Sequence, residues 1–289
     1  MLSSGTDESH IIEIALDDIS NEALREPFRM LEYVKSKIKD DNQYYLIIDE
    51  VQLLGRFVDV LNSFMHIDNV DIYVTGSNSR FLSKDVATEF RGRGIEIHIY
   101  PLSFAELYQA RGGDKYALWK SYYTYGELPY LASLNDNARK AEYLSSLNQT
   151  LYLKDIVERN KIANEDEFSE LMNLMASSIG LPCNPNKIAN TFKSVKKVSL
   201  ASQTIAKYLS FMEDAFIVEK SVRYDIKGRK YIGTLSKYYF QDVGLRNALL
   251  NFRQVEETHL MENVIYNELR RCGYSIDVGM IEVRSATQR

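Results

Sequence analysis

The first 125 residues alternate short apolar runs with longer amphipathic stretches, and this alternation limits the possible folds more than any other feature of the chain. The strand-like runs occupy residues 10–18, 44–50, 71–79 and 95–103, and the helix-like stretches occupy residues 26–40 and 57–66. Strands separated by helices of about ten residues are typical of βαβ units, which build a parallel sheet. The pattern therefore predicts an α/β domain with a parallel sheet over residues 1–125.

The spacing of the apolar residues changes after this domain. It becomes helical from about residue 137 to residue 212, and two strand-like runs follow at residues 216–225 and 237–242. We interpret the rest of the chain as three parts. These are a helical region at 126–180, a helix-turn-helix with a hairpin at 181–255, and a partial α/β segment at 256–289.

Composition argues against several classes of protein. No apolar run approaches the roughly 20 residues that cross a bilayer, and the start of the chain lacks the basic and apolar parts of a signal peptide. We therefore expect a cytoplasmic protein with no membrane partner. Cys183 and Cys272 have no CxxC spacing and the chain has four histidines, which argues against a disulfide framework or a zinc site. The net charge of −5 argues against a uniformly basic nucleic-acid binder.

Two acidic residues, Asp49 and Glu50, directly follow the apolar run that begins at Tyr44. The carboxyl ends of parallel strands face the ligand crevice of such sheets, so both side chains are expected there. An aspartate in this place can hold Mg²⁺ through water, and a glutamate can take a proton from an attacking water molecule. The alternative is a strand that ends at the surface in two acids, because short motifs of this kind also arise by chance.

Polar and basic residues accompany the next two strand-like runs. Thr75, Ser77 and Asn78 end one run, where a polar side chain can orient the water that attacks a γ-phosphate. Arg91 and Arg93 precede the other run, and their planar guanidinium groups suit phosphate oxygens. The alternatives are an ordinary polar turn for the first group and a solvated turn for the second.

In this order, the three features resemble the Walker B strand, the sensor strand and the arginine-bearing strand entry of one family. This family comprises prokaryotic AAA-superfamily ATPases with a winged-helix domain and a nuclease-like C-terminal domain of unknown function. Further stretches that agree with it are "IYPLSFAEL", "YGELPYL", "LYLKDIVERNKI", "ASQTIAKYLSFMEDAFIV" and "MENVIYNELRRCGY". The resemblance covers roughly residues 10–284.

The resemblance implies an ATPase that uses ATP and Mg²⁺ and has a P-loop-type parallel αβα sheet. By position, Asp49 would hold Mg²⁺ through water and Glu50 would be the catalytic base. Ser77 and Asn78 would sense the γ-phosphate. Arg93 would be the arginine finger, and Arg91 would be a further contact to the nucleotide.

The phosphate-binding loop of this family is absent from the sequence, because no Gly-Lys-Ser or Gly-Lys-Thr occurs in the 289 residues. In the family the loop lies just before the stretch that resembles residues 10–18, so we interpret the chain as an N-terminally truncated AAA core. Either the chain is a fragment, or the gene has lost the loop. The loop's backbone N–H groups and its lysine supply most of the phosphate contacts. We therefore expect weak ATP binding and little hydrolysis. An unpaired strand edge and self-association are expected as well.

A second departure from the family lies near the end of the sequence. Glu262 and Glu268 lie on the stretch that opens the nuclease-like fold, but the later acids and lysine of its metal site have no counterpart here. Two carboxylates on one helix are not a metal site by themselves, so we expect both to be surface residues. Glu127 stands where the family more often has glycine, and we expect it to alter only a turn.

The segment from Lys187 to Lys237 is strongly basic, with eleven Lys or Arg residues and four acids. Its order of helix, turn, helix and hairpin predicts a winged helix whose second helix begins at Ser199. Polar residues early in that helix would meet base edges, and basic residues would contact phosphates. The predicted DNA contacts are Lys193, Lys196, Lys197, Ser202, Gln203, Thr204, Lys207, Lys227, Arg229 and Lys230. The alternative is a packing or protein-interaction module with solvated lysines.

Three hypotheses follow. The first is an AAA-superfamily ATPase that remodels DNA or a protein client and that associates with copies of itself. The second is a non-enzymatic DNA-binding or protein-interaction module built on the same scaffold. The third is a component of a nuclease-linked defence or mobile-element system.

Overall fold

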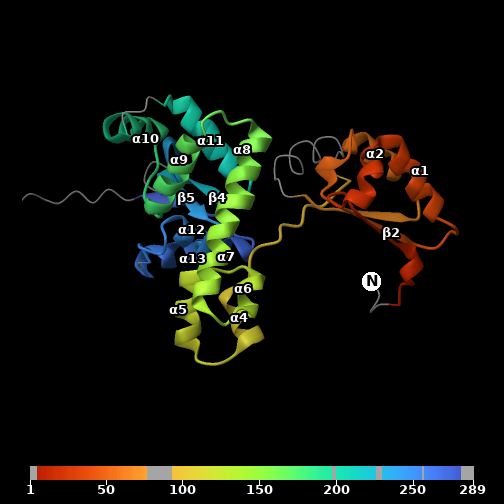
Figure 1. Cartoon of the computed structure of the whole chain (residues 1–289), viewed down its shortest axis with the longest axis horizontal. Coiled ribbons are helices and arrows are strands. Elements are labelled where there is room, and N and C mark those ends of the chain that lie inside the picture. The colour runs from red at the N-terminus through yellow and green to blue at the C-terminus, as the bar shows by residue number, and fades with distance from the viewer. Residues whose placement is uncertain (1–4, 77–92, 197–199, 226–229, 256, 281–289) are drawn as a thin grey trace, which may run out of the picture. The chain divides into compact units, whose positions relative to one another are not determined.

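The computed structural model describes residues 5–76, 93–196, 200–225, 230–255 and 257–280 of the 289-residue chain. The chain divides into two compact units, residues 1–98 and residues 99–289 (Figure 1). Ser77, Asn78 and Arg91 lie outside the described residues, as do Lys197, Lys227 and Arg229. The described helices include none that is both long enough and apolar enough to cross a membrane.

The first unit is built around a parallel sheet in which β2 (Tyr44–Asp49) lies between β1 (Ile11–Ala15) and β3 (Val70–Val74). In the register of the sheet, Ile48 lies opposite both Ile14 and Val74, so the three strands end at the same edge. The predicted α/β class with a parallel sheet is therefore confirmed. Among the described residues of this unit, the helices are α1 (Pro27–Lys37) and α2 (Phe57–Phe64), with 3₁₀ helices at Glu8–His10, Ile19–Arg25 and Val51–Leu53.

The alternation of the sequence explains the core of this unit. Along β2, Tyr44, Leu46 and Ile48 are buried, whereas the residues between them are partly exposed. Helix α1 begins where the Glu26 side chain accepts a hydrogen bond from the Arg29 N–H and Pro27 takes the first helical position. It buries Met30 and Val34 in the same cluster as the strand residues.

The strand predicted at residues 95–103 is wrong, because residues 93–103 form neither strand nor helix. Ile95, Ile97 and Ile99 are 93%, 72% and 83% exposed, respectively. An alternating apolar run becomes a strand only where a neighbouring edge takes up its backbone hydrogen bonds. Among the described residues, no strand pairs with this run.

The second unit is mainly helical. Its helices are α4 (Phe104–Arg111), α5 (Lys115–Tyr125), α6 (Pro129–Ser133), α7 (Asn137–Ser146), α8 (Lys154–Asn160), α9 (Glu165–Ser177), α10 (Pro185–Thr191), α11 (Ser202–Asp214), α12 (Val243–Leu249) and α13 (Glu257–Arg271), with π-helical turns at Leu147–Leu153 and Phe192–Lys196. The helical spacing predicted from about residue 137 to residue 212 is confirmed by α7, α8, α9, α10 and α11, with short breaks between them. Helix α11 begins at Ser202 without a side-chain cap, so the predicted start at Ser199, which is outside the described residues, is wrong.

A second sheet follows α11, with β4 (Val218–Asp225) between β5 (Lys230–Phe240) and β6 (Val278–Met280). The β4 and β5 strands pair in antiparallel fashion, which confirms the predicted hairpin, and β6 runs parallel to β4. An isolated bridge also joins Cys183 to Ser236 on β5. The core of this unit includes Phe168, Leu171, Ile205, Met212 and Phe240.

Candidate functional site

The acidic end of β2 lies beside the end of β3. Asp49 is the last residue of β2 and is exposed, and Thr75 follows β3 directly. The Thr75 hydroxyl donates a hydrogen bond to Asp49 Oδ1, and the Glu50 N–H donates to Thr75 Oγ1 across 3.4 Å. The parallel register thus brings the carboxylate and the hydroxyl together at one edge of the sheet.

Glu50 turns the chain out of the sheet. Its backbone is left-handed, with φ 54° and ψ 48°, a conformation that costs a residue other than glycine about 1 kcal/mol or more. The turn is held by the Val51 N–H, which donates to the Thr75 carbonyl oxygen across 3.0 Å, and by Gln52, whose Nε2 donates to the Glu50 carboxylate. The turn therefore places two carboxylates on consecutive residues at the carboxyl end of β2.

Oxygen ligands of this kind suit Mg²⁺, which binds carboxylates and keeps several of its waters. Asp49 and Thr75 supply a carboxylate and a hydroxyl, so the donor set fits a hydrated Mg²⁺ ion. The described part of the chain contains no cluster of three or more His, Cys, Asp or Glu side chains that would hold a metal ion without other ligands. Further ligands, such as water or phosphate oxygens, would be needed.

The other predicted nucleotide contacts are not assembled around Asp49 in the described structure. Arg93 is exposed, lies outside any helix or strand, and makes no hydrogen bond or ion pair with the other described residues. Ser77, Asn78 and Arg91 are outside the described residues. The residue that contacts Asp49 is Thr75, which the sequence placed in the same polar cluster. Its position directly after the strand that neighbours β2 is the sequence feature that could have assigned Thr75 to the site.

The predicted DNA-contacting helix presents part of its surface to solvent. On α11, Gln203 and Lys207 are exposed, whereas Ser202 and Thr204 are half-buried. Lys207 Nζ lies 5.6 Å from the centre of the Phe211 ring, and Lys193, just before the end of the preceding helical segment, is exposed. Lys196 and Lys230 lie at element ends, but their side chains are not among those described. Part of the predicted surface is therefore accessible.

One basic residue of this segment already has an acidic partner. Lys237 Nζ lies 2.7 Å from Glu262 Oε1, which also accepts a hydrogen bond from the Tyr239 hydroxyl. Glu268 pairs with Arg271. Glu262 and Glu268 thus each make an ion pair with a basic side chain, and the described residues contain no cluster of three or more His, Cys, Asp or Glu that could hold a metal ion.

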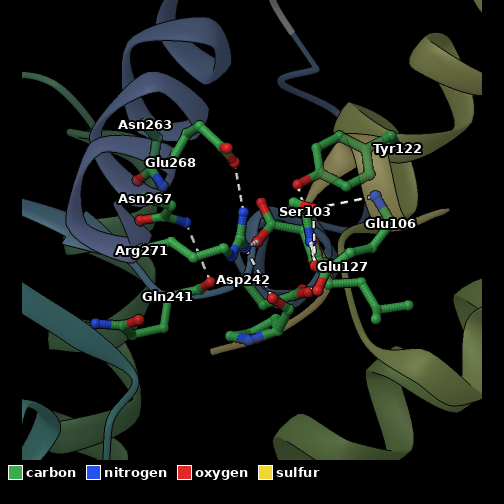
Figure 2. A network of polar contacts seen from close by, with 12 residues as sticks. Ser103, Glu106, Tyr122, Glu127, Gln241, Asp242, Asn263, Asn267, Glu268 and Arg271 are labelled. Carbon is green, nitrogen blue, oxygen red and sulfur yellow. Dashed lines mark hydrogen bonds and ion pairs between the residues drawn. The ribbon is translucent and has the colours of Figure 1, made fainter. Parts of the chain in front are cut away.

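A network of polar side chains is enclosed in the second unit (Figure 2). Asp242, which is 2% exposed, caps α12: its carboxylate accepts hydrogen bonds from the Leu245 N–H at 2.7 Å and from the Glu127 N–H at 2.6 Å. Burial raises the pKa of Asp242 to about 6, although the backbone donors oppose this change. The cap joins the start of α12 to the turn after α5.

Glu127 extends into this network, and the expectation that it alters only a turn is wrong. The residue is 1% exposed, and neither carboxylate oxygen accepts a hydrogen bond within the described structure. The nearest cation is Arg271, whose Nη2 is 3.9 Å from Glu127 Oε2. Burial raises the pKa of Glu127 well above its ordinary value, the Asp242 charge adds to the rise, and Arg271 opposes it. No local sequence pattern links residues this far apart in the chain.

Helix α13 holds the other side of the network, as Figure 2 shows. Arg271 donates to the Pro101 carbonyl oxygen at 2.7 Å and to Glu268 at 2.5 Å. Asn263 both accepts from the Phe240 N–H and donates to the Phe240 carbonyl oxygen, each at 2.7 Å. Asn267 donates to the carbonyl oxygens of Phe240 and Gln241. The network therefore fixes the end of β5 against α13.

Two protein families match the chain, and the boundary between their matches lies near the boundary between the two structural units. Residues 1–108 match the AAA domain family, and residues 116–256 match a domain of unknown function (DUF8612). The match to the AAA domain family thus spans the whole first unit, including its parallel sheet and the acidic end of β2.

Two curated relatives share much of the sequence. An uncharacterised protein of Haemophilus influenzae is 35% identical over 243 residues, which are 82% of this chain and 60% of that protein. An uncharacterised protein of Methanocaldococcus jannaschii is 28% identical over 283 residues, which are 93% of this chain and 60% of that protein. The chain thus spans 60% of the length of each relative.

Two solved structures align with most of the chain, at low similarity. One is the Orc1 protein of Aeropyrum pernix in complex with DNA, at 15% identity and a TM-score of 0.30, covering 86% of this chain and 79% of that one. The other is the Orc2 protein of the same organism, in ADPNP–ADP complexes, at 11% identity and a TM-score of 0.45, covering 93% and 82%. Both scores are too low to establish a shared overall fold.

Proposed function

We propose that this chain belongs to an ATP-dependent protein of the AAA type, in which the acidic end of β2 binds MgATP. The observation that carries the proposal is the pairing of Asp49 with Thr75 at the carboxyl edge of the parallel sheet. In a sheet of this kind, ligands bind beyond the carboxyl ends of the strands. The match of residues 1–108 to the AAA domain family supports the same assignment.

The residues at this edge would divide the work as follows. Asp49 would bind a water molecule in the hydration shell of Mg²⁺, and the Thr75 hydroxyl would orient the Asp49 carboxylate. Glu50 would take the proton from an attacking water. Mg²⁺, bound with ATP, would supply positive charge beside the phosphates. Ser77, Asn78, Arg91 and Arg93 would contribute the γ-phosphate and guanidinium contacts that their positions in the sequence suggest.

The 289 residues contain no Gly-Lys-Ser or Gly-Lys-Thr, so they lack the sequence that provides most phosphate contacts in P-loop proteins. We therefore expect them to bind MgATP weakly by themselves, and hydrolysis to be slow. Coupling to a remodelling activity on DNA or on a protein client belongs to the whole protein.

Calorimetric titration with MgATP tests the proposal on this chain and on Asp49→Ala, Thr75→Val and Asp71→Ala variants. Asp71 is an exposed acid near the amino end of β3, opposite Tyr45 and away from the carboxyl edge of the sheet, and it serves as the matched control. Asp49→Ala is expected to weaken binding at least about tenfold, which corresponds to about 1.4 kcal/mol. Thr75→Val should have a smaller effect of the same sign, and Asp71→Ala should have none.

Equal binding by the Asp49→Ala and Asp71→Ala variants would remove Asp49 from the site. If no variant and no wild-type sample binds MgATP at millimolar concentration, nucleotide binding by these residues is rejected. Glu50→Gln separates the two roles at this edge, since it should preserve binding and lower any hydrolysis rate.

A second candidate function is DNA contact by residues 181–255. The helices α10 and α11 followed by the β4–β5 hairpin, with the Cys183–Ser236 bridge, have the order of a winged helix. The exposure of Gln203, Lys207 and Lys193 supports this candidate, because a recognition helix must present polar and basic side chains to the DNA groove. It does not require nucleotide binding.

Fluorescence anisotropy with a labelled DNA duplex, measured over a range of salt concentrations, tests this second function. Lys193→Gln and Lys207→Gln should each weaken DNA binding. Each should also reduce the slope of the logarithm of the binding constant against the logarithm of the salt concentration by about one, because one fewer counterion is released. Lys161→Gln, at an exposed lysine between α8 and α9, is the control and should change neither quantity. Binding that all three variants preserve would favour a protein-interaction module instead.

A further inference from the structure

A shallow cavity of about 310 Å³ lies on the second unit, between the end of α4, helix α5 and the start of α7. Two basic side chains, Arg111 and Lys140, line it together with the Ser121 hydroxyl. The same three residues also line a narrower cavity beside it, which reaches Glu127. This surface belongs to neither proposed site, because it is distant in sequence from both Asp49 and α11.

Lys140 is unusual among lysines because it is only 5% exposed. Its Nζ donates to Ser121 Oγ across 3.2 Å and lies 5.4 Å from the centre of the Tyr125 ring. Within the described structure, no carboxylate lies at ion-pair distance from Lys140. The ammonium group is therefore enclosed with a hydroxyl and an aromatic ring as its partners.

An enclosed ammonium group without an acid is costly, because burial removes water and nothing neutralises the charge. Burial lowers the pKa of Lys140, and the nearby charge of Arg111 lowers it further. An anion between the two cations would offset both effects, because it would stabilise the buried charge and screen the repulsion between Lys140 and Arg111. The cavity gives such an anion room and access from solvent.

The other polar groups of the cavity fit this interpretation. Arg111 Nη2 donates to Asn135 Oδ1 across 2.9 Å, and the guanidinium group has further N–H donors. The cavity also contains one acid, Asp114, but its carboxylate accepts the Ala117 N–H at 2.7 Å as the cap of α5. The two cations outnumber this single acid.

We propose that Arg111, Ser121 and Lys140 form a binding site for a small oxyanion, with phosphate as its preferred ligand. The Arg111 guanidinium group would donate two parallel hydrogen bonds to the anion, since its planar geometry matches two oxygens of a phosphate group. Ser121 Oγ and Lys140 Nζ would donate from the enclosed side. The site is independent of the proposed nucleotide site, so either can fail without the other.

The test is calorimetric titration of the full chain with sodium phosphate, at an ionic strength held constant with sodium chloride. A parallel thermal unfolding series follows the fluorescence of Trp119, the sole tryptophan of the chain, which lies on α5. Saturable binding and a saturable rise in the unfolding temperature are expected, since a ligand that binds only the folded state stabilises it. Acetate in place of phosphate shows whether a carboxylate is also accepted.

Three variants and one control decide the assignment. Arg111→Gln and Lys140→Gln should each raise the dissociation constant for phosphate at least about tenfold, and Ser121→Ala should raise it less. Lys120→Gln changes an exposed lysine on the same helix, α5, and should leave the dissociation constant unchanged. Arg111 is exposed, so its variant is expected to fold even if Lys140→Gln does not.

Phosphate binding that is absent from the wild-type chain, or that is equal in the wild-type, Arg111→Gln and Ser121→Ala proteins, would overturn the proposal. If Lys120→Gln weakened phosphate binding as much as Arg111→Gln and Lys140→Gln do, general surface charge would bind the anion, and the proposal would be overturned. Tighter binding of acetate than of phosphate would retain the site but reassign its preferred ligand to a carboxylate.

Discussion

The backbone N–H of Glu127 donates a hydrogen bond of 2.6 Å to the Asp242 carboxylate, although 115 positions separate the two residues in the chain. The contact holds the turn after α5 against the first turn of α12. Two glycines allow this close approach: a Cβ atom on Gly126 would overlap the Asp242 carboxylate, and one on Gly244 would overlap the Tyr125 carbonyl oxygen. The stability of the second unit therefore depends on small residues at both ends of the contact.

Gly244→Ala is expected to destabilise the second unit by more than about 3 kcal/mol, because backbone atoms of Tyr125 and Gly126 cannot move aside as a flexible side chain would. Unfolding in urea, followed by Trp119 fluorescence, measures the effect. Gly273→Ala is the control: its Cβ would meet nothing within 4 Å, but its φ of +84° is unfavourable for alanine. It should cost about 1 kcal/mol. Equal costs for the two variants would contradict the overlap at Gly244.

The buried carboxyl of Glu127 predicts a change in the pH dependence of stability. Its pKa is higher in the folded chain than in the unfolded chain, where the ordinary value is 4.5. The folded state therefore retains a proton that the unfolded state loses, and the free energy of unfolding falls as the pH rises above that value. Glu127→Gln cannot ionise, so the variant should gain stability relative to the wild type as the pH increases.

Urea unfolding of both proteins at about pH 5 and about pH 8 measures this difference. Asp242, whose pKa of about 6 is also raised, remains in both proteins, as does Arg271. A variant that loses stability relative to the wild type as the pH rises would show that Glu127 is ionised and paired with Arg271.

Much of the secondary structure could be predicted from the sequence, because it depends on local patterns. The apolar runs that end at Ala15, Asp49 and Val74 form the strands of the parallel sheet, and their common edge follows from parallel pairing. The position of Asp49 at a strand end follows for the same reason. The roles assigned to Asp49 and Glu50 stay predictions.

Contacts between distant residues could not be predicted in this way. Glu127 is buried because α12 and α13 pack on the turn that carries it, and its own neighbours in sequence do not indicate this. The isoleucines at 95–99 alternate as in a strand, yet a strand also needs a paired edge, which a single run cannot specify. The predicted domain boundaries at residues 125, 180 and 255 stay predictions as well.

Asn263 is expected to be essential for the end of β5. Its side chain pairs with both backbone groups of Phe240 and is fully buried. Asn263→Ala would leave a buried N–H without a partner and remove one donor from the carbonyl oxygen, at a cost of about 2–4 kcal/mol. Asn137→Ala, at an exposed residue that begins α7, is the control and should change the free energy of unfolding by less than about 0.5 kcal/mol.

The exposed isoleucines predict self-association of the chain. Ile95, Ile97 and Ile99 present three large apolar side chains to solvent at alternate positions, and β1 and β3 each have a side that pairs with no other described strand. An extended apolar run and an unpaired strand edge are complementary, so two copies can add backbone hydrogen bonds and bury these side chains together.

Ile97→Lys should therefore shift the mass measured by light scattering toward the 33.4 kDa monomer, because a charge in the middle of the run opposes strand pairing between copies. The free energy of unfolding should change by less than about 0.5 kcal/mol, since Ile97 is 72% exposed. Tyr116→Lys, at an 83% exposed aromatic residue on α5, is the matched control and should leave the mass unchanged. A wild-type chain that is monomeric at every concentration, or an equal shift in the control, would exclude this segment as the cause of association.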